Sequence, residues 1–327
     1  MRLVDLVERE YFSQHDFDII LAQLLLDRTT QKNIIWATHS YEAFGSDFAF
    51  DQEIIPAYLQ GNFSALIQPR MAKAIDTQDD RTHDHGEVFT PSWICNEQNN
   101  LVDEQWFGRA DVFNTTDGQT WKATEGKIEF PLRGLHKWQK YIDTKRMEIT
   151  CGEAPYLVSR YDTVTGDEIP ILQRIGLLDR KLRVVGENTE TEQDWEEWAL
   201  RAFQSIYGYE FQGDSLVIAR ENLLLTYIEY YQDRFGKWPG SKQLEQIARV
   251  ISWNLWQMDG LKYVVPFSCK PIVMERFSFD GIIRTEDPCP GCKYGDNRAH
   301  TGAYCMVRDW REKTSFEFKT LLKGGRI

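Results

Sequence analysis

The sequence has no long hydrophobic run, and this argues against a helical membrane protein. No apolar stretch approaches the roughly 18 residues of a membrane-spanning helix, and the charged first ten residues lack the apolar segment of a secretory signal. The 327 residues are 42% hydrophobic and 27% charged, as in globular proteins. We therefore expect a cytoplasmic protein that does not associate with membranes.

Basic residues are scarce relative to acidic ones, which bears on nucleic-acid binding. The chain has 38 Lys and Arg against 50 Asp and Glu, a formal net charge of −12. Tight, unaided binding to a phosphate backbone needs clustered basic side chains, so this balance weighs against it. DNA stays open as a substrate because charge can be segregated. Residues 308–326 hold six basic and three acidic side chains, but a solvated surface tail is the simpler interpretation of that run.

Three common catalytic signatures are also missing. The sequence contains no G-x-x-x-x-G-K-[ST] phosphate loop and no G-x-S-x-G nucleophile turn. It also has no convincing P-D…(D/E)-x-K arrangement of nuclease carboxylates. A nuclease function is therefore not supported.

Cysteine is infrequent, but three of the six cysteines fall within 17 residues near the C-terminus. In a cytosolic chain such clustering indicates a metal site rather than disulfides. The pattern C-x2-C-x7-H-x4-C is formed by Cys289, Cys292, His300 and Cys305. It resembles a zinc knuckle with a longer central loop, and a closed four-ligand site predicts structural Zn²⁺. We expect Cys95 and Cys269 to be buried as small apolar residues.

The periodicity along the chain predicts a parallel α/β fold. We expect a helical cap over residues 1–75 and loops with short strands over 76–130. Further on, predicted helices alternate with predicted strands, which is typical of a parallel sheet. The predicted helices cover residues 190–204, 215–231 and 241–250, and the predicted strands cover residues 147–150, 205–211 and 253–258.

Two of these predicted strands end in a feature suited to binding a nucleotide. Residues 148–157 run from a strand into a turn at Cys151 and Gly152, where small residues let a ligand approach the backbone. Glu210 ends the next strand, the position from which an acid hydrogen-bonds ribose hydroxyls in nucleotide-binding α/β folds. A carboxylate suits a vicinal diol because it accepts two hydrogen bonds.

Two further segments complete the pattern. Residues 86–91 (GEVFTP) form a strand end or turn that stops at a proline, and residues 258–261 (MDGL) end another predicted strand in Asp259 and Gly260. The Asp259 carboxylate is able to accept a hydrogen bond from an exocyclic amine. Each segment alone is weak support for a site, and their order along the chain carries the prediction.

In this order the four segments resemble the motifs of adenine-N6 DNA methyltransferases. The family's G-x-x-[FY]-[TS]-P segment is matched by residues 86–91 and its second-strand and helix motifs by residues 208–210 and 219–223. Its cofactor motif is matched by Glu148, Cys151, Gly152, Pro155, Tyr156 and Leu157. The middle of the chain also resembles phage and mobile-element proteins labelled restriction endonuclease subunit M.

The resemblance implies a Rossmann-like class I methyltransferase sheet that binds S-adenosylmethionine (SAM). It implies that Glu210 holds the ribose, Asp259 the adenine, and the Cys151–Gly152 turn the methionine moiety. The segment Phe89, Thr90 and Pro91 would close over the cofactor. DNA is then the substrate, a separate specificity subunit is a further partner, and the setting is the cytoplasm of a bacterium or a phage-infected host.

Two features depart from the family pattern. About 50 residues separate the cofactor motif from the Glu210 strand, more than the family has. The catalytic tetrad [DNS]-P-P-[YFW] is absent, and Asp287 and Pro288 are its nearest counterpart, although a loop ahead of the metal site explains them better. The alternative is therefore a catalytically inactive methyltransferase-fold factor that binds DNA or protein.

These predictions divide the chain into three parts. Residues 1–75 would form the helical cap, residues 76–285 the SAM-binding core, and residues 286–327 a zinc-knuckle-like C-terminal element.

Overall fold

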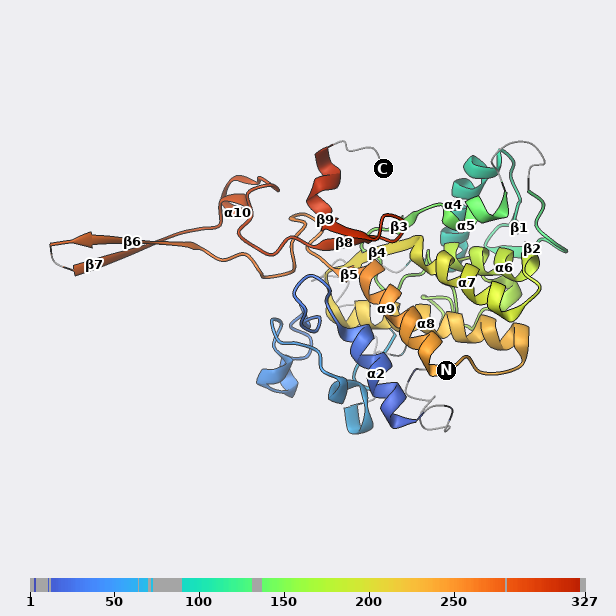
Figure 1. The fold of residues 1–327 in the computed structure, drawn as a ribbon, viewed down its shortest axis with the longest axis horizontal. Helices are drawn as coiled ribbons and strands as arrows, with labels where there is room; N and C mark the ends of the chain where they lie inside the picture. The colour runs from blue at the N-terminus through green and yellow to red at the C-terminus, as the bar shows by residue number, and fades with distance from the viewer. Residues whose placement is uncertain are drawn as a thin grey trace.

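The computed structural model describes residues 3, 11, 13–63, 65–69, 72, 90–130, 137–279 and 281–323. Figure 1 shows a helical body from which one long hairpin extends. The helices of the described residues are α2 (Gln14–Leu25), α4 (Ser92–Phe107), α5 (Trp138–Asp143), α6 (Leu177–Asn188), α7 (Glu192–Gln204), α8 (Gly213–Phe235), α9 (Ser241–Asn254) and α10 (Pro290–Tyr294). The strands are β1 (Asn114–Asp117), β2 (Thr120–Ala123), β3 (Arg146–Glu148), β4 (Ile206–Glu210), β5 (Leu255–Gln257), β6 (Ile272–Ser278), β7 (Gly281–Asp287), β8 (Met306–Asp309) and β9 (Thr314–Glu317).

A three-stranded parallel sheet lies at the centre of the body. Its strand order is β3-β4-β5, with Glu148 opposite Gly208 and Glu210 opposite Gln257. Helices α6 and α7 connect β3 to β4, and α8 and α9 connect β4 to β5, because parallel neighbours need long crossovers. Every residue of β4 is buried, as expected for a strand covered on both faces. All three strands therefore end at one edge of the sheet.

This sheet confirms the mixed α/β class but not the finer assignment. Three parallel strands are common to many α/β folds, and the other sheets are the antiparallel pairs β1-β2, β6-β7 and β8-β9. A Rossmann-like methyltransferase fold therefore stays a prediction.

The N-terminal region is less helical than the sequence suggested. Within the described part of residues 1–75, α2 is the one α-helix, and the rest is loops and short 3₁₀ turns at Glu42–Phe44, Ser46–Phe48, Pro56–Leu59 and Gly61–Phe63. Helix α2 packs on α9 and α8 and shares one hydrophobic core with them. At the other end, β8 and β9 contribute Val307 and Phe316 to a smaller core with Trp256. The proposed boundaries at residues 75 and 285 stay predictions.

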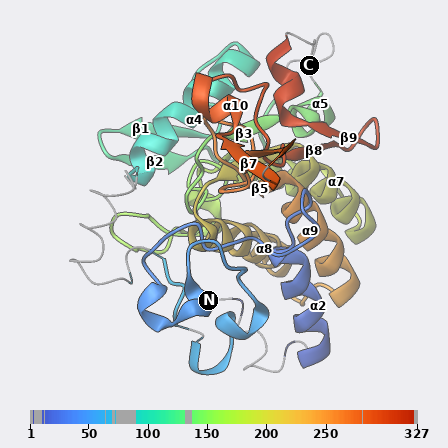
Figure 2. The ribbon, with the colours of Figure 1, turned by 90° about the vertical axis from the view of Figure 1, so that its left-hand side faces the viewer.

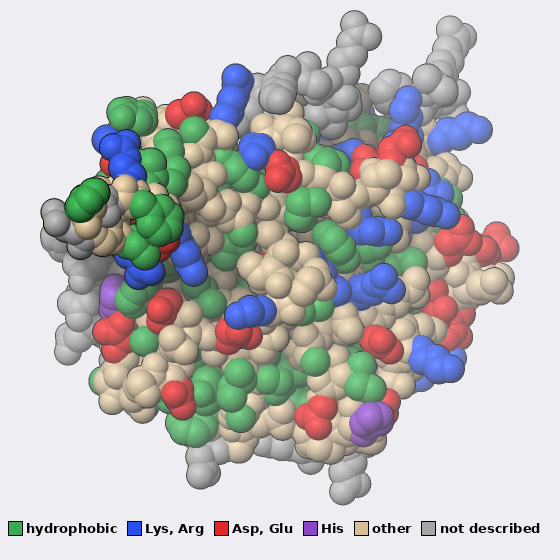
Figure 3. Space-filling view, turned by 60° about the vertical axis from the view of Figure 1, so that its left-hand side comes forward, with side chains coloured by type: hydrophobic (Ala, Val, Ile, Leu, Met, Phe, Trp, Pro, Cys, Tyr) green, Lys and Arg blue, Asp and Glu red, His purple; other side chains and the backbone are tan. Residues whose placement is uncertain are grey.

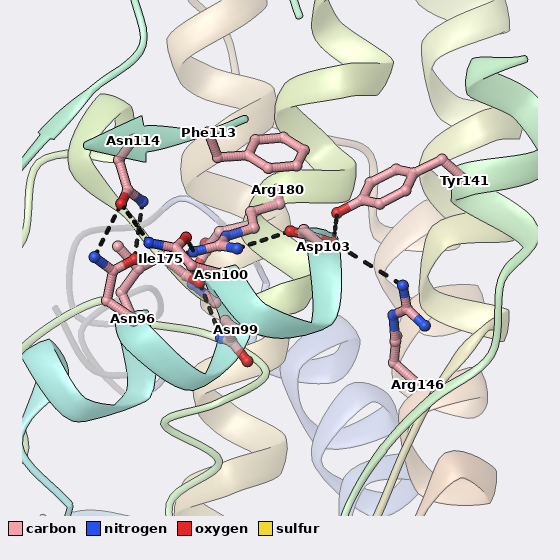
Figure 4. A network of polar contacts seen from close by, with 12 residues as sticks. Asn96, Asn99, Asn100, Asp103, Phe113, Asn114, Tyr141, Arg146, Ile175 and Arg180 are labelled. Carbon is pink, nitrogen blue, oxygen red and sulfur yellow. Dashed lines mark hydrogen bonds and ion pairs between the residues drawn. The ribbon is translucent and has the colours of Figure 1, made fainter. Parts of the chain in front are cut away.

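A buried polar network holds α4 to the body (Figure 4). Arg180 of α6 donates to Asp103 at 2.7 Å, and its other amino group donates to Asn96 and Asn100 at 2.9 and 2.7 Å. Asp103 also accepts a hydrogen bond from Tyr141 at 3.0 Å. The prediction of loops for residues 76–130 is wrong over α4, because this helix buries a polar face.

Candidate cofactor edge and candidate metal centre

The structure brings three predicted acids to the same edge of the central sheet. Glu148 is the last residue of β3, Glu210 is the last residue of β4, and Asp259 follows β5 by two residues. In Figure 1 this edge faces the side from which the β6–β7 hairpin projects, and in Figure 2 the hairpin stands in front of the sheet. Ligands of open α/β sheets bind outside the carboxyl ends of the strands, so this edge is the candidate cofactor site.

Glu210 joins the end of β4 to the turn after β3. One carboxylate oxygen accepts a hydrogen bond from the Gly152 amide at 2.8 Å. The other accepts from the amides of Phe211 and Gln212 at 2.9 and 3.2 Å. Burial raises the pKa of Glu210, although these three amides favour the charged form. The oxygen bonded to Gly152 can accept a second bond, so the carboxylate is still able to accept a hydrogen bond from one hydroxyl group.

Glu148 anchors the same turn from its other side. Its carboxylate accepts hydrogen bonds from the amides of Tyr156 and Leu157 at 3.4 and 3.2 Å. Burial raises its pKa well above the ordinary value, and the nearby charge of Glu210 adds to this. These contacts give Glu148 a role in shaping the turn, and its predicted part in cofactor binding stays a prediction.

Four of the eight non-glycine residues that have positive φ angles in the described part of the chain lie in the segments that leave β3 and β5. After β3, Thr150 and Ala154 have φ angles of 46° and 64°, with Gly152 between them at 52°. After β5, Tyr263 and Phe267 have φ angles of 62° and 58°. Left-handed conformations are costly outside glycine and concentrate at binding and catalytic sites. They favour this edge as a functional site.

The Thr90–Pro91 segment lies against the turn after β3. The pKa of Tyr156 is raised by burial, and a hydrogen bond with Thr90 acts in the opposite direction. The carbonyl of Thr90 accepts from Thr163 at 3.1 Å, and Pro91 is the N-cap of α4. Phe89 and the rest of residues 81–89 lie outside the described residues.

Asp259 and Gly260 are both used by the local structure after β5. The Asp259 carboxylate accepts from the amides of Leu261 and Lys262 at 3.0 and 3.2 Å and pairs with the Lys262 amine at 2.9 Å. A Cβ at Gly260 would lie 2.8 Å from the Tyr209 ring, so the chain passes closely over that ring. The predicted adenine contact of Asp259 stays a prediction.

An aromatic group beside Glu210 was not anticipated from the sequence. The ring of Phe211 lies 5.6 Å from that of Phe267, which lies 4.7 Å from that of Phe50. Phe267 is 50% exposed. These residues are distant in sequence and follow no motif spacing. Aromatic walls with a few polar groups suit a planar base.

A second site is formed by three cysteines and one histidine at the base of the β6–β7 hairpin. The potential ligand atoms of Cys269, Cys289, Cys292 and His300 all lie within 4.8 Å of one another. His300 Nδ1 is 3.6, 3.7 and 3.7 Å from the three sulfurs. Zinc bound tetrahedrally at about 2.3 Å from sulfur and about 2.0 Å from nitrogen separates such atoms by about 3.6 Å. The cluster could therefore hold a metal such as zinc.

Local contacts prepare this cluster for a cation. Burial acts against ionisation of Cys289, but hydrogen bonds led by those from Thr301 lower its pKa to about 5, which favours the thiolate that binds metal. The Thr301 amide donates to Cys289 Sγ at 3.2 Å. A Cβ at Gly291 would lie 2.5 Å from His300 Nδ1, so a side chain there would push the histidine out of place.

The identity of the fourth residue corrects the sequence prediction. Cys305 is fully buried in the smaller core, where its Sγ lies 3.3 Å from the carbonyl of Gln257 and burial raises its pKa well above normal. Cys269 is partly exposed and takes the place expected for Cys305. The spacing C-x2-C-x7-H favoured Cys305, the next cysteine after His300. In the structure the β6–β7 hairpin instead brings Cys269, 20 positions before Cys289, into the cluster.

Asp287 and Pro288 lie in another part of the structure from the cofactor edge. Asp287 is the last residue of β7, which pairs only with β6, and both side chains are exposed. A catalytic tetrad should follow a strand of the parallel sheet. This position gives no support to a catalytic role for Asp287 and Pro288.

Comparison of the chain with protein-family models, curated proteins and solved structures finds no match. None of the described helices is both long enough and apolar enough to cross a bilayer. The two sites are therefore the basis for assigning a function.

Proposed function

We propose that the edge formed by β3, β4 and β5 binds S-adenosylmethionine. The observation that carries this proposal is the hydrogen bond between Glu210 and Gly152, which joins an acid for the ribose to the small-residue turn for the methionine moiety. The aromatic group of Phe50, Phe211 and Phe267 supplies a surface for the adenine. The strained turns on both sides give further support.

We further propose that the chain is a DNA adenine-N6 methyltransferase acting with a separate specificity subunit. The test is transfer of tritiated methyl from S-adenosylmethionine to unmodified DNA by the purified chain, with and without the cognate subunit. Labelled DNA supports the enzyme. SAM binding without transfer in either case supports the alternative, a factor of the same fold that has lost its chemistry. The exposed position of Asp287 favours that alternative.

The affinity for SAM should depend on pH through Glu210. We expect the ionised carboxylate to accept from a ribose hydroxyl, and burial places its pKa above the ordinary value. Affinity is therefore full above that raised pKa and falls as the pH decreases through it. Titrations between about pH 5 and pH 8 should show this loss at a higher pH than an exposed glutamate would give. The Glu210→Gln variant should have a flatter profile, and an equal slope in both proteins would contradict the assignment.

The metal at the Cys3His cluster is proposed to be structural zinc. Four protein ligands close the site and leave no position for substrate. Purified Cys269→Ser protein is expected to lose its zinc, from about one ion per chain to near none. Cys305→Ser is the matched control and should keep its zinc, because that sulfur lies in the core. If Cys269→Ser protein kept its zinc and Cys305→Ser protein lost it, Cys305 would be the fourth ligand, as the sequence pattern predicted.

A further inference from the structure

The hairpin of residues 270–288, here called the arm, has almost no packing of its own. The described side chains of β6 and β7 are all exposed, including apolar ones near the tip. Phe277 is 87% exposed, and Ile282 and Ile283 are more than half exposed. The arm extends away from the body in Figure 1, and Figure 3 shows hydrophobic, basic and acidic side chains mixed along it and over the face beside it.

Such an arm should not be stable by itself. An isolated two-stranded hairpin is at best marginally stable in water, because it has no second layer to bury its side chains. Glu275 and Arg284 form an ion pair across the two strands at 2.7 Å, and both side chains are exposed. Such an exposed pair contributes little to the stability of the arm. The buried residues at its base, Cys289, Gly291 and His300, are those around the metal cluster.

The metal ligands lie at the two ends of this segment. Cys269 precedes β6, and Cys289 follows β7, so the cluster closes the base of the arm. Cys292 and His300 extend the closure to residue 300. Beyond the cluster the chain is held by the body. Val265 donates to the Ala303 carbonyl at 2.9 Å, and Cys305 donates to the Tyr263 carbonyl at 3.0 Å.

We infer that the metal folds residues 270–299 and that its removal unfolds this segment while the body stays folded. The inference rests on the proposed zinc. A metal site that does not exist in the unfolded chain contributes its binding free energy to folding. Here we expect that contribution to be confined to the arm and its base. The backbone hydrogen bonds of Val265 and Cys305 hold the flanking chain to the body and do not involve the metal ligands, so they should persist without the metal.

Limited proteolysis with trypsin tests this inference on the full chain. Potential cleavage sites in the segment are Arg276, Arg284, Lys293 and Arg298, whereas Lys270 precedes a proline and is not cleaved. Removal of zinc by a chelator should speed cleavage at these sites by about tenfold or more, because cleavage follows local opening. The unfolding transition of the body should change little. Restoring zinc should restore resistance.

Two outcomes would overturn the inference, and zinc analysis of the same samples separates them. A chain that binds no zinc removes both the proposed metal and the inference. A chain that binds one zinc but is cleaved equally with and without it, or that unfolds as a whole on chelation, removes the inference alone.

Gly291→Ala provides a second test, since its Cβ would displace His300. This variant should be cleaved rapidly without chelator, while Gly186→Ala, which has open space around its Cβ, should behave as wild type.

Discussion

Replacing Arg180 by Met is expected to destabilise the protein by about 3–5 kcal/mol. Arg180 and its partner Asp103 are each about 1% exposed, and their ion pair is 2.7 Å long. The substitution removes the donor and leaves a buried carboxylate without its main compensating charge. Asn96 and Asn100 lose a donor at the same time. Urea denaturation followed by circular dichroism measures the effect.

An exposed ion pair provides the control for this experiment. Lys122 and Glu125 form a 2.8 Å pair with side chains 73% and 84% exposed. Lys122→Met should leave the urea midpoint unchanged, because exposed pairs contribute little. An Arg180→Met protein as stable as wild type would show that the network in Figure 4 does not hold α4 to the body.

The second large effect is expected on cofactor affinity. Glu210→Gln should weaken SAM binding by about 10–100-fold, the value of one hydrogen bond to a charged acceptor. The amide keeps the size of the side chain but places a donor on one of the two positions where the carboxylate now has an acceptor, either the one that accepts from Gly152 or the one beside it. Isothermal titration calorimetry of wild type and variant measures the change.

A control separates loss of ligand contacts from general loss of acidic charge. Glu97 is exposed on α4, and Glu97→Gln should bind SAM as wild type does. Thermal unfolding of each variant monitors the fold. If folded Glu210→Gln protein bound SAM with unchanged affinity, Glu210 would be a structural anchor of the turn and not a ribose ligand.

The parts of the fold that follow an apolar pattern were predictable. Helices α7, α8 and α9 and strand β4 lie close to the expected ranges, because most of their buried side chains are hydrophobic. The convergence of Glu148 and Glu210 followed from the parallel order of their strands. In contrast, β5 begins only at Leu255, since α9 continues to Asn254 where a strand was expected.

Helix α4 was not predictable because its buried face is polar. Asn96, Asn99 and Asp103 recur at helical spacing on that face, and each is at most 2% exposed. Hydrophobic periodicity is the main signal for a helix, and here it is replaced by hydrogen bonds to partners distant in sequence. Asn99, for example, donates to the carbonyls of Tyr156 and Ile175 at 3.0 Å.

The metal site was predictable for the residues that are close in sequence and not for the distant one. Cys289, Cys292 and His300 follow short spacings that bring ligands together across turns. Cys269 joins them only because β6 and β7 pair in a register that places Ile272 opposite Asp287. A sequence pattern does not contain that register.

Titration of the purified chain with S-adenosylmethionine tests the central claim most directly. We predict saturable binding of one molecule per chain at the β3–β4–β5 edge, weakened by Glu210→Gln. A folded protein that produced no binding signal with this ligand would contradict the claim. The inference about the zinc-dependent arm would be unaffected, because it does not depend on SAM binding.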